Sequence, residues 1–173
     1  MEKYIPKMYK KSIYDIDYEK LKKNNIKCLM FDLDNTLLGI NTNIPDKDTC
    51  NLIKKLKTDF KVFVLSNNSS KKRLNEVSKN LDIEVVGSAM KPFSKGFNKI
   101  KNKYNFSKEE MCIIGDQILT DILGGNKYGI YTVLIDPLPI KELKVTGINR
   151  FFERIKLKKL EKRGLFKKGE YYG

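Results

Sequence analysis

The chain has 173 residues, of which 40% are hydrophobic and 32% charged, a composition typical of one soluble globular domain. Lys and Arg outnumber Asp and Glu by 35 to 21, and the net charge of +14 indicates an anionic partner such as nucleic acid, an acidic membrane surface or a phosphorylated substrate. The absence of histidine excludes phosphohistidine phosphatases, His-ligated zinc sites and Ser-His triads.

Lysine-rich usage can also reflect genome composition, so clustered lysines carry more weight than scattered ones. The three cysteines include no Cys-x-x-Cys pair, and we expect them to be reduced. The first residues lack the apolar stretch of a signal peptide, and no apolar run approaches the ~20 residues that span a bilayer. These features favour a cytoplasmic protein.

Short apolar runs alternate with amphipathic segments, which predicts βαβ units. We therefore expect an α/β fold with a doubly wound, five-stranded parallel sheet. The expected strands are Lys27–Leu33, Lys61–Leu65, Ile83–Val86, Met111–Gly115 and Tyr131–Asp136. The expected helices are Asp17–Asn24, Asp46–Lys57, Ser70–Asn80, Phe93–Tyr104, Leu119–Tyr128 and the basic Gly147–Lys162.

We expect a single domain over 1–173. Its core would be 26–140, with an N-terminal extension over 1–25 and a basic helix and tail over 146–173. The last residues, Lys167–Gly173, are predicted to be disordered.

Asp32 and Asp34 end the first expected strand, after the apolar run Cys28–Phe31. Because alternate side chains of a strand point the same way, these two carboxylates project together. Like charges so close need a cation or a proton between them, which indicates a divalent metal beside a carboxylate nucleophile. The alternative is a solvated turn, since Asp and Asn favour turns.

Ser66, Asn67 and Asn68 follow the second expected strand and precede a helix. Their hydroxyl, amide and N–H groups could cradle an anion, or could serve only to cap the helix. Lys91 stands before Pro92 at the next helix entrance, where it could neutralise phosphate charge. One lysine is a weak signal in so lysine-rich a chain.

Asp116 follows the fourth expected strand and could complete a magnesium site with Asp32. Asp121 falls in the first turn of the next helix, where it could bind metal-bound water, orient Lys91 or stabilise the helix dipole. Oxygen ligands without His or Cys favour Mg²⁺. All these polar residues fall at the carboxyl ends of strands, where open parallel sheets bind ligands.

The ordered set Asp32-x-Asp34-x-Thr36, Ser66, Lys91-Pro92 and Gly115-Asp116-x-x-x-x-Asp121 resembles the four motifs of the haloacid dehalogenase (HAD) superfamily of phosphatases, over about Lys27 to Pro137. A closer similarity, to the YqeG branch of subfamily IIIA, covers nearly the whole chain. It includes Ser66–Asn68, Ala89–Pro92, Gly115–Asn126, Thr146, Asn149, Arg150 and Glu153. That branch is related to phosphatidylglycerophosphate phosphatases.

The resemblance implies that Asp32 attacks phosphorus and becomes an aspartyl-phosphate. Asp34 then protonates the leaving oxygen and later activates water. It also implies Mg²⁺ held by the Asp32 carboxylate, the Asp34 backbone carbonyl and Asp116.

The resemblance further implies that Ser66, Asn67 and Lys91 bind the phosphoryl group. Thr36 and Asp121 would hold these groups in place without contacting the substrate themselves. Asn35 replaces the Gly common in the superfamily, a substitution usual in this branch.

Neither place where HAD enzymes insert cap domains has room for one. About a dozen residues separate Asp34 from the helix near Asp46, and one helix and one strand fill the chain between Ser66 and Lys91, whereas a domain needs roughly 50 residues. An essentially capless, open site suits a bulky or surface-bound substrate.

From Arg150 to Gly173, nine Lys or Arg stand against three Glu. Phe151, Phe152 and Ile155 fall on one helical face. Such a segment could lie on an anionic membrane, or its apolar face could pack on the sheet; the two interpretations can coexist.

We therefore expect an Mg²⁺-dependent phosphatase that acts on an anionic lipid head group, phosphatidylglycerophosphate, at the inner membrane face. A phosphatase of nucleotides, nucleic-acid ends or other soluble phosphates is an alternative that the charge permits, although no aromatic stacking platform supports nucleic acid. A non-catalytic phosphate-binding module ranks lower. A receiver domain ranks low as well, because it lacks the Asp-x-Asp-x-Thr turn.

Overall fold

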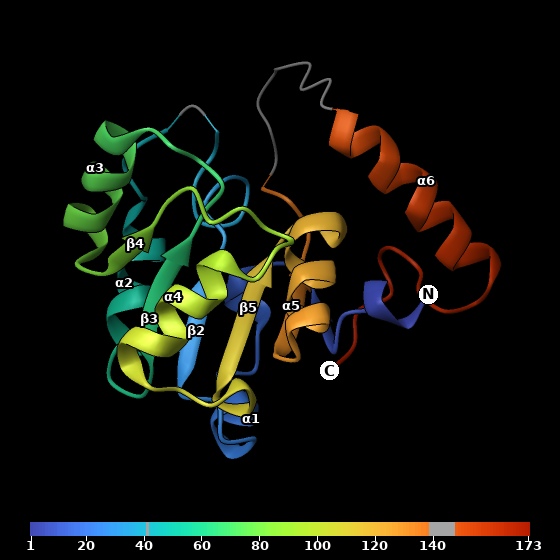
Figure 1. Ribbon diagram of the computed structural model, residues 1–173, viewed down its shortest axis with the longest axis horizontal. Helices are drawn as coiled ribbons and strands as arrows, with labels where there is room; N and C mark the ends of the chain where they lie inside the picture. Colours follow the sequence, from blue (N-terminus) through green and yellow to red (C-terminus); the bar gives the residue numbers. More distant parts are fainter. Residues whose placement is uncertain (41, 139–147) are drawn as a thin grey trace.

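A six-stranded parallel sheet forms the centre of the molecule (Figure 1). The computed structural model describes residues 1–40, 42–138 and 148–173. The strand order is β1-β6-β5-β2-β3-β4. The strands are β1 (Met8–Lys10), β2 (Cys28–Phe31), β3 (Lys61–Leu65), β4 (Glu84–Val86), β5 (Met111–Gly115) and β6 (Tyr131–Ile135).

The predicted doubly wound parallel sheet is confirmed, but it has a sixth strand. β1 comes from the expected N-terminal extension and pairs with β6, Met8 lying opposite Val133. A strand of only three residues is too short to show the alternation of apolar and polar residues that predicts a strand. The partner strand, far along the chain, is what makes this segment a strand.

The helices alternate with the strands, and their bounds differ from those predicted by one or two residues, except at Leu119–Tyr128. That segment starts as a π-helix, Ile118–Ile122, before α5. The α-helices are α1 (Tyr18–Lys23), α2 (Lys47–Leu56), α3 (Lys71–Leu81), α4 (Lys95–Tyr104), α5 (Leu123–Tyr128) and α6 (Ile148–Lys162). Asp46 caps α2, because its side chain accepts from the Thr49 N–H, and Ser70 caps α3, because its side chain accepts from the Arg73 N–H.

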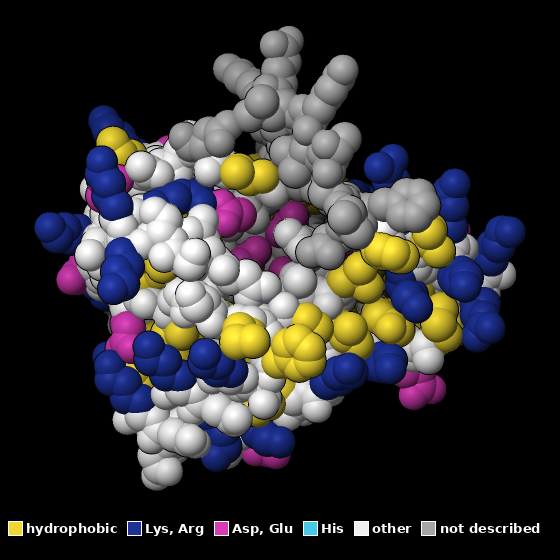
Figure 2. All heavy atoms as spheres, turned by 45° about the horizontal axis from the view of Figure 1, so that its top comes forward, with side chains coloured by type: hydrophobic (Ala, Val, Ile, Leu, Met, Phe, Trp, Pro, Cys, Tyr) yellow, Lys and Arg dark blue, Asp and Glu magenta, His cyan; other side chains and the backbone are white. Residues whose placement is uncertain are grey.

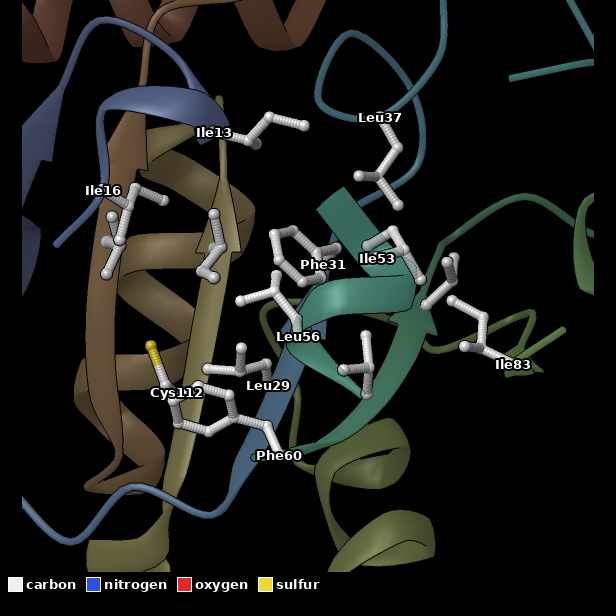
Figure 3. Close-up of a cluster of buried hydrophobic side chains, with 14 of the residues drawn as sticks. Ile13, Ile16, Leu29, Phe31, Leu37, Ile53, Leu56, Phe60, Ile83 and Cys112 are labelled. Atoms are coloured by element: carbon white, nitrogen blue, oxygen red, sulfur yellow. The ribbon is translucent and has the colours of Figure 1, made fainter. Parts of the chain in front are cut away.

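Successive residues of β2 face opposite sides of the sheet, as the period of a strand requires. Leu29 and Phe31 join a core cluster with side chains of α1, α2 and α3 (Figure 3). Cys28 and Met30 join a second cluster with side chains of α4 and α5. In Figure 1, α4 lies in front of the sheet and α2 behind it. The sheet is therefore covered on both faces and open at its strand ends.

The C-terminal residues are ordered, so the predicted disorder of Lys167–Gly173 is wrong. Tyr172 and Tyr9 exchange two backbone hydrogen bonds of 2.9 Å, which cover the outer edge of β1. The Tyr171 hydroxyl donates to Asp136 at 2.6 Å, and its ring lies 4.8 Å from that of Tyr9. The polar composition of the tail gives no sign of its contacts with Tyr9, because Tyr9 lies over a hundred residues away in the chain.

Of the two interpretations of the basic helix, packing on the sheet through Phe152 and Ile155 is not what the structure shows, because α6 docks through Leu160. Leu160 is fully buried, in a third cluster with Tyr9, Ile118 and Phe166. Phe152 is 54% exposed and Ile155 is 38% exposed. The expected helix start at Gly147, the end of the expected core at Ile140 and the similarity at Thr146 lie outside the described residues, as do the side chains of Asn149, Arg150 and Phe151.

Within the described part of the chain, only α3 and β4 lie between Ser66 and Lys91, and no helix or strand lies between Asp34 and α2. No inserted domain covers the strand ends there, as predicted.

No helix in the described ranges is both long and apolar enough to cross a membrane.

Replacing Leu160 with Ala tests the docking of α6. The substitution leaves a cavity in the third cluster, so we expect the free energy of unfolding to fall by about 2–5 kcal/mol in urea denaturation. Leu165→Ala, at a side chain 41% exposed, is the control and should cost less than about 1 kcal/mol. Equal stability of Leu160→Ala and wild type would show that α6 is undocked in solution.

Candidate active site

The candidate site lies at the carboxyl ends of β2, β3 and β5, three neighbouring strands of the sheet. Figure 2, with this edge turned forward, shows acidic side chains in a hollow. The predicted residues follow these strands directly: Asp32 after β2, Ser66 after β3 and Asp116 after β5. Parallel pairing therefore brings together groups that are far apart in sequence.

Asp32 extends the pairing of β2, because its N–H donates to the Ile114 carbonyl at 2.8 Å. The chain then turns sharply, and the Asn35 N–H donates to the Leu38 carbonyl at 2.7 Å. Asn35 has φ = 62°, a left-handed conformation that Gly and Asn adopt most readily. This requirement explains physically why Asn and Gly can replace each other at this position.

Lys91 is the buried cation of the site, with a side chain only 2% exposed. Its Nζ donates to Asp32 Oδ1 and to Asp121 Oδ1, both at 2.7 Å. Burial, which lowers the pKa of Lys91, is outweighed by these two carboxylates, so the pKa is raised above its usual value. The lysine is thus held in its charged form.

The side chain of Asn67 fixes the backbone of Lys91. Its Oδ1 accepts the Lys91 N–H at 2.7 Å, and its Nδ2 donates to the Lys91 carbonyl at 3.0 Å. The peptide bond from Lys91 to Pro92 is cis. Asn67 was expected next to the phosphoryl group, and its side chain serves here to place the lysine.

Asp32, Asp116 and Asp121 form a buried acidic cluster, in which one carboxylate oxygen from each lies within 4.8 Å of the others. The Thr36 hydroxyl donates to Asp116 Oδ1 at 3.5 Å, and the Gln117 N–H donates to Asp121 Oδ2 at 3.2 Å. Burial, the largest cause, raises the pKa of Asp121 to about 6, although Lys91 opposes this shift. Three acids in so small a volume need more positive charge than one lysine supplies.

Gly115 makes room for this cluster. A Cβ at this position would lie 2.2 Å from Asp121 Oδ2, so any side chain would displace the carboxylate that binds Lys91. This contact explains the Gly-Asp pair in the sequence.

Ser66 is buried, and its Oγ accepts the Asn68 N–H at 3.1 Å. The cap of α3 is Ser70, so Ser66 and Asn68 form the turn before the helix rather than its cap. The capping interpretation of these two residues is therefore wrong.

Arg73, which the sequence analysis missed, binds the second acid of the motif. Its Nη1 lies 2.5 Å from Asp34 Oδ1, and its Nη2 donates to the carbonyls of Gly39 and Thr42 at 3.0 and 3.2 Å. One signal marks Arg73 in the sequence: every other basic residue before Arg150 is Lys.

The acidic cluster fits a divalent cation such as Mg²⁺, because its donors are hard carboxylate oxygens that are buried and close together. The cluster contains Asp121 and not the side chain of Asp34, which binds Arg73. Because the Asp34 side chain binds Arg73, Asp34 could bind a metal in this cluster only through its backbone carbonyl, as expected from the resemblance. With a cation bound, such a cluster can hold an anionic group next to a carboxylate, an arrangement that phosphoryl transfer requires.

Comparison with known proteins agrees with this geometry. Residues 1–138 match the family model described as mitochondrial PGP phosphatase. The chain is 35% identical over 162 residues to "Probable phosphatase YqeG" of Bacillus subtilis, covering 93% of this chain and 94% of that protein. It is 29% identical over 147 residues to phosphatidylglycerophosphate phosphatase 1 of Arabidopsis thaliana, covering 78% of this chain and 41% of that protein.

Among solved structures, the magnesium-bound HAD-hydrolase YfnB of Bacillus subtilis shares the fold, with a TM-score of 0.52 and 16% identity. The match covers 69% of this chain and 96% of that one.

Lys91→Met tests the charge balance of the cluster. In metal-free buffer at about pH 8, we expect the free energy of unfolding to fall by about 3–5 kcal/mol, because Asp32 and Asp121 stay buried without their cation. Asp121 has a folded pKa above its usual 3.8, so its protonated form favours the fold at low pH. The deficit should therefore shrink toward about pH 5 in urea titrations.

The double variant Lys91→Met/Asp121→Asn is the control. It removes one of the stranded charges and should regain part of the lost stability. A double variant no more stable than Lys91→Met would contradict the coupling.

Proposed function

Because the chain belongs to the mitochondrial PGP phosphatase family of HAD phosphatases, we propose that it hydrolyses the phosphomonoester of phosphatidylglycerophosphate, releasing inorganic phosphate and leaving phosphatidylglycerol. The observation that carries this proposal is the contact of the buried Lys91 Nζ with Asp32 at 2.7 Å, inside an acidic cluster at the open edge of the sheet. That arrangement joins a nucleophile, a cation for the phosphoryl group and a metal site in one hollow.

Mg²⁺ would be held by the carboxylates of Asp32 and Asp116 and by the backbone carbonyl of Asp34. When bound, it would offset the negative charge that gathers on the transferring phosphoryl group. Lys91 would offset the same charge, and Ser66 and the backbone at Asn67 would bind the remaining phosphoryl oxygens. Thr36 and Asp121 hold Asp116 and Lys91 in place.

Asp32 acts as the nucleophile. A carboxylate oxygen forms a bond to phosphorus as the bond from phosphorus to the ester oxygen breaks, which yields an aspartyl-phosphate. Water then attacks phosphorus, the bond to Asp32 breaks, and inorganic phosphate leaves. Burial of the Asp32 side chain to 8% exposure limits competing water at this oxygen.

Asp34 gives a proton to the leaving ester oxygen and takes one from the attacking water. Its side chain is 25% exposed, more open than Asp32, which suits a group that meets substrate and solvent in turn. Arg73 holds the carboxylate through Oδ1 and also donates to the carbonyls of Gly39 and Thr42. We assign Arg73 as the positioning residue of this acid.

A lipid substrate accounts for the surroundings of the site. Met90 and Phe93, on either side of Lys91-Pro92, are 50% and 68% exposed, so apolar side chains stand next to the phosphate-binding lysine. Phe152 and Ile155 are exposed on the basic helix α6. Exposed apolar groups beside lysines suit an anionic membrane surface, and the chain would act there as a peripheral cytoplasmic enzyme.

The substrate assignment is tested by phosphate release from phosphatidylglycerophosphate in neutral detergent micelles. Wild-type protein with Mg²⁺ should be active, and chelation should abolish the activity. Asp32→Asn, which keeps the shape of the side chain, should lower kcat by about 10³-fold or more because the nucleophile is lost.

Nucleotide and sugar phosphates serve as comparison substrates. Higher kcat/KM on one of these than on the lipid would overturn the lipid assignment. Unchanged activity of Asp32→Asn would overturn the aspartyl-phosphate mechanism.

Membrane association is tested by co-sedimentation with phosphatidylglycerol vesicles. Phe152→Ser/Ile155→Ser should weaken binding by about 10-fold or more, since each side chain would contribute apolar burial in the lipid. Neutral phosphatidylcholine vesicles and high salt are the controls, and both should bind less wild-type protein. Equal binding of the variant and wild type would exclude α6 as the membrane contact.

A further inference from the structure

A cavity of about 320 Å³ lies beside the acidic cluster and shares Asp116 with it. Its walls come from the end of β6, the π-helix, α6 and the C-terminal segment. In Figure 2, hydrophobic side chains extend from the rim of the acidic hollow toward the basic surface on the side of α6. The volume falls at the lower end of the ~300–1,000 Å³ typical of small-molecule sites.

The cavity combines apolar walls with two exposed cations. Ile118, Leu157 and Phe166 contribute apolar surface. Arg154 and Lys168 also line it, and both are exposed and without an acidic partner among the described residues.

The acidic residues of the cavity already have hydrogen bonds. Asp136 accepts from the hydroxyls of Tyr9 and Tyr171, both at 2.6 Å. Glu153 accepts the Ile118 N–H at 2.6 Å. These carboxylates keep their charge, but their oxygens accept hydrogen bonds from neutral groups of the protein. Arg154 and Lys168 are the exposed charged side chains of the cavity that can donate to a ligand, which indicates an anion next to an apolar group.

We propose that this cavity is a leaving-group subsite, which binds a second anionic group of the substrate through Arg154 and Lys168 and the first carbons of its hydrocarbon part against Ile118, Leu157 and Phe166. This inference rests on the proposed function and names the part of the substrate that the cavity binds. The shared Asp116 places the subsite directly beside the reacting phosphate. A phosphodiester with attached acyl chains meets both demands, and its longer chains stay in the membrane.

The direct test is binding of dihexanoyl-phosphatidylglycerol, which carries the phosphodiester and short chains but no phosphomonoester. It is titrated below its micelle concentration and followed by NMR. Arg154→Ala/Lys168→Ala should weaken binding by about 10- to 100-fold, as expected for the loss of two charge-assisted contacts.

Lys158→Ala/Lys159→Ala is the matched control, because it removes the same charge from exposed positions of α6 that do not line the cavity. This variant should bind like wild type. Equal weakening in both double variants would show that binding depends only on net charge and would overturn the subsite. An absence of binding to wild type would overturn it as well.

Hydrolysis separates this inference from the proposed function. Arg154→Ala/Lys168→Ala should raise KM for phosphatidylglycerophosphate by about 10-fold or more, yet leave p-nitrophenyl phosphate and phosphatidic acid, which lack the second anion, within about 2-fold. An equal change on all three substrates would overturn the subsite alone. Wild type that binds dihexanoyl-phosphatidylglycerol at Arg154 and Lys168 but does not hydrolyse the lipid would overturn the proposed function alone.

Discussion

The charge balance among Lys91, Asp32 and Asp121 is the interaction on which the site depends. Three ionisable side chains with at most 8% exposure are stable together only if each charge has a partner at hydrogen-bond distance. Two neighbouring residues, Asn67 and Gly115, hold these charged groups in place. The Asn67 side chain binds both the N–H and the carbonyl of Lys91. Gly115 leaves the space that Asp121 occupies.

The parallel sheet makes this arrangement possible. β2 lies between β3 and β5, so the loops after these three strands meet at one edge. Without an inserted domain over this edge in the described residues, the acidic hollow opens to the surface between exposed apolar side chains. Under the proposed function, this openness would let a membrane-bound phosphate reach Asp32, and water would have to be excluded by the substrate itself and by the adjoining cavity.

The N-terminal and C-terminal segments form part of the cavity next to the acidic cluster. β1 adds to the sheet at β6, Tyr172 covers its outer edge, and α6 docks through Leu160. This docking brings Arg154 and Lys168 to the cavity that begins at Asp116. Segments that resemble solvated basic tails in the sequence thus form a wall of the cavity beside the acidic cluster.

The sequence by itself determined the parallel α/β fold, because the alternation of apolar runs and amphipathic segments is local, and it indicated Asp32, Asp34, Ser66, Lys91 and Asp116 because each ends a strand or opens a helix. Four features depended on contacts between residues far apart: β1, the ordered tail, the Arg73 ion pair with Asp34 and the exposed face of α6. A three-residue edge strand or a single arginine carries no period of its own. Only its distant partner decides what it does, and that partner is brought close by the tertiary structure.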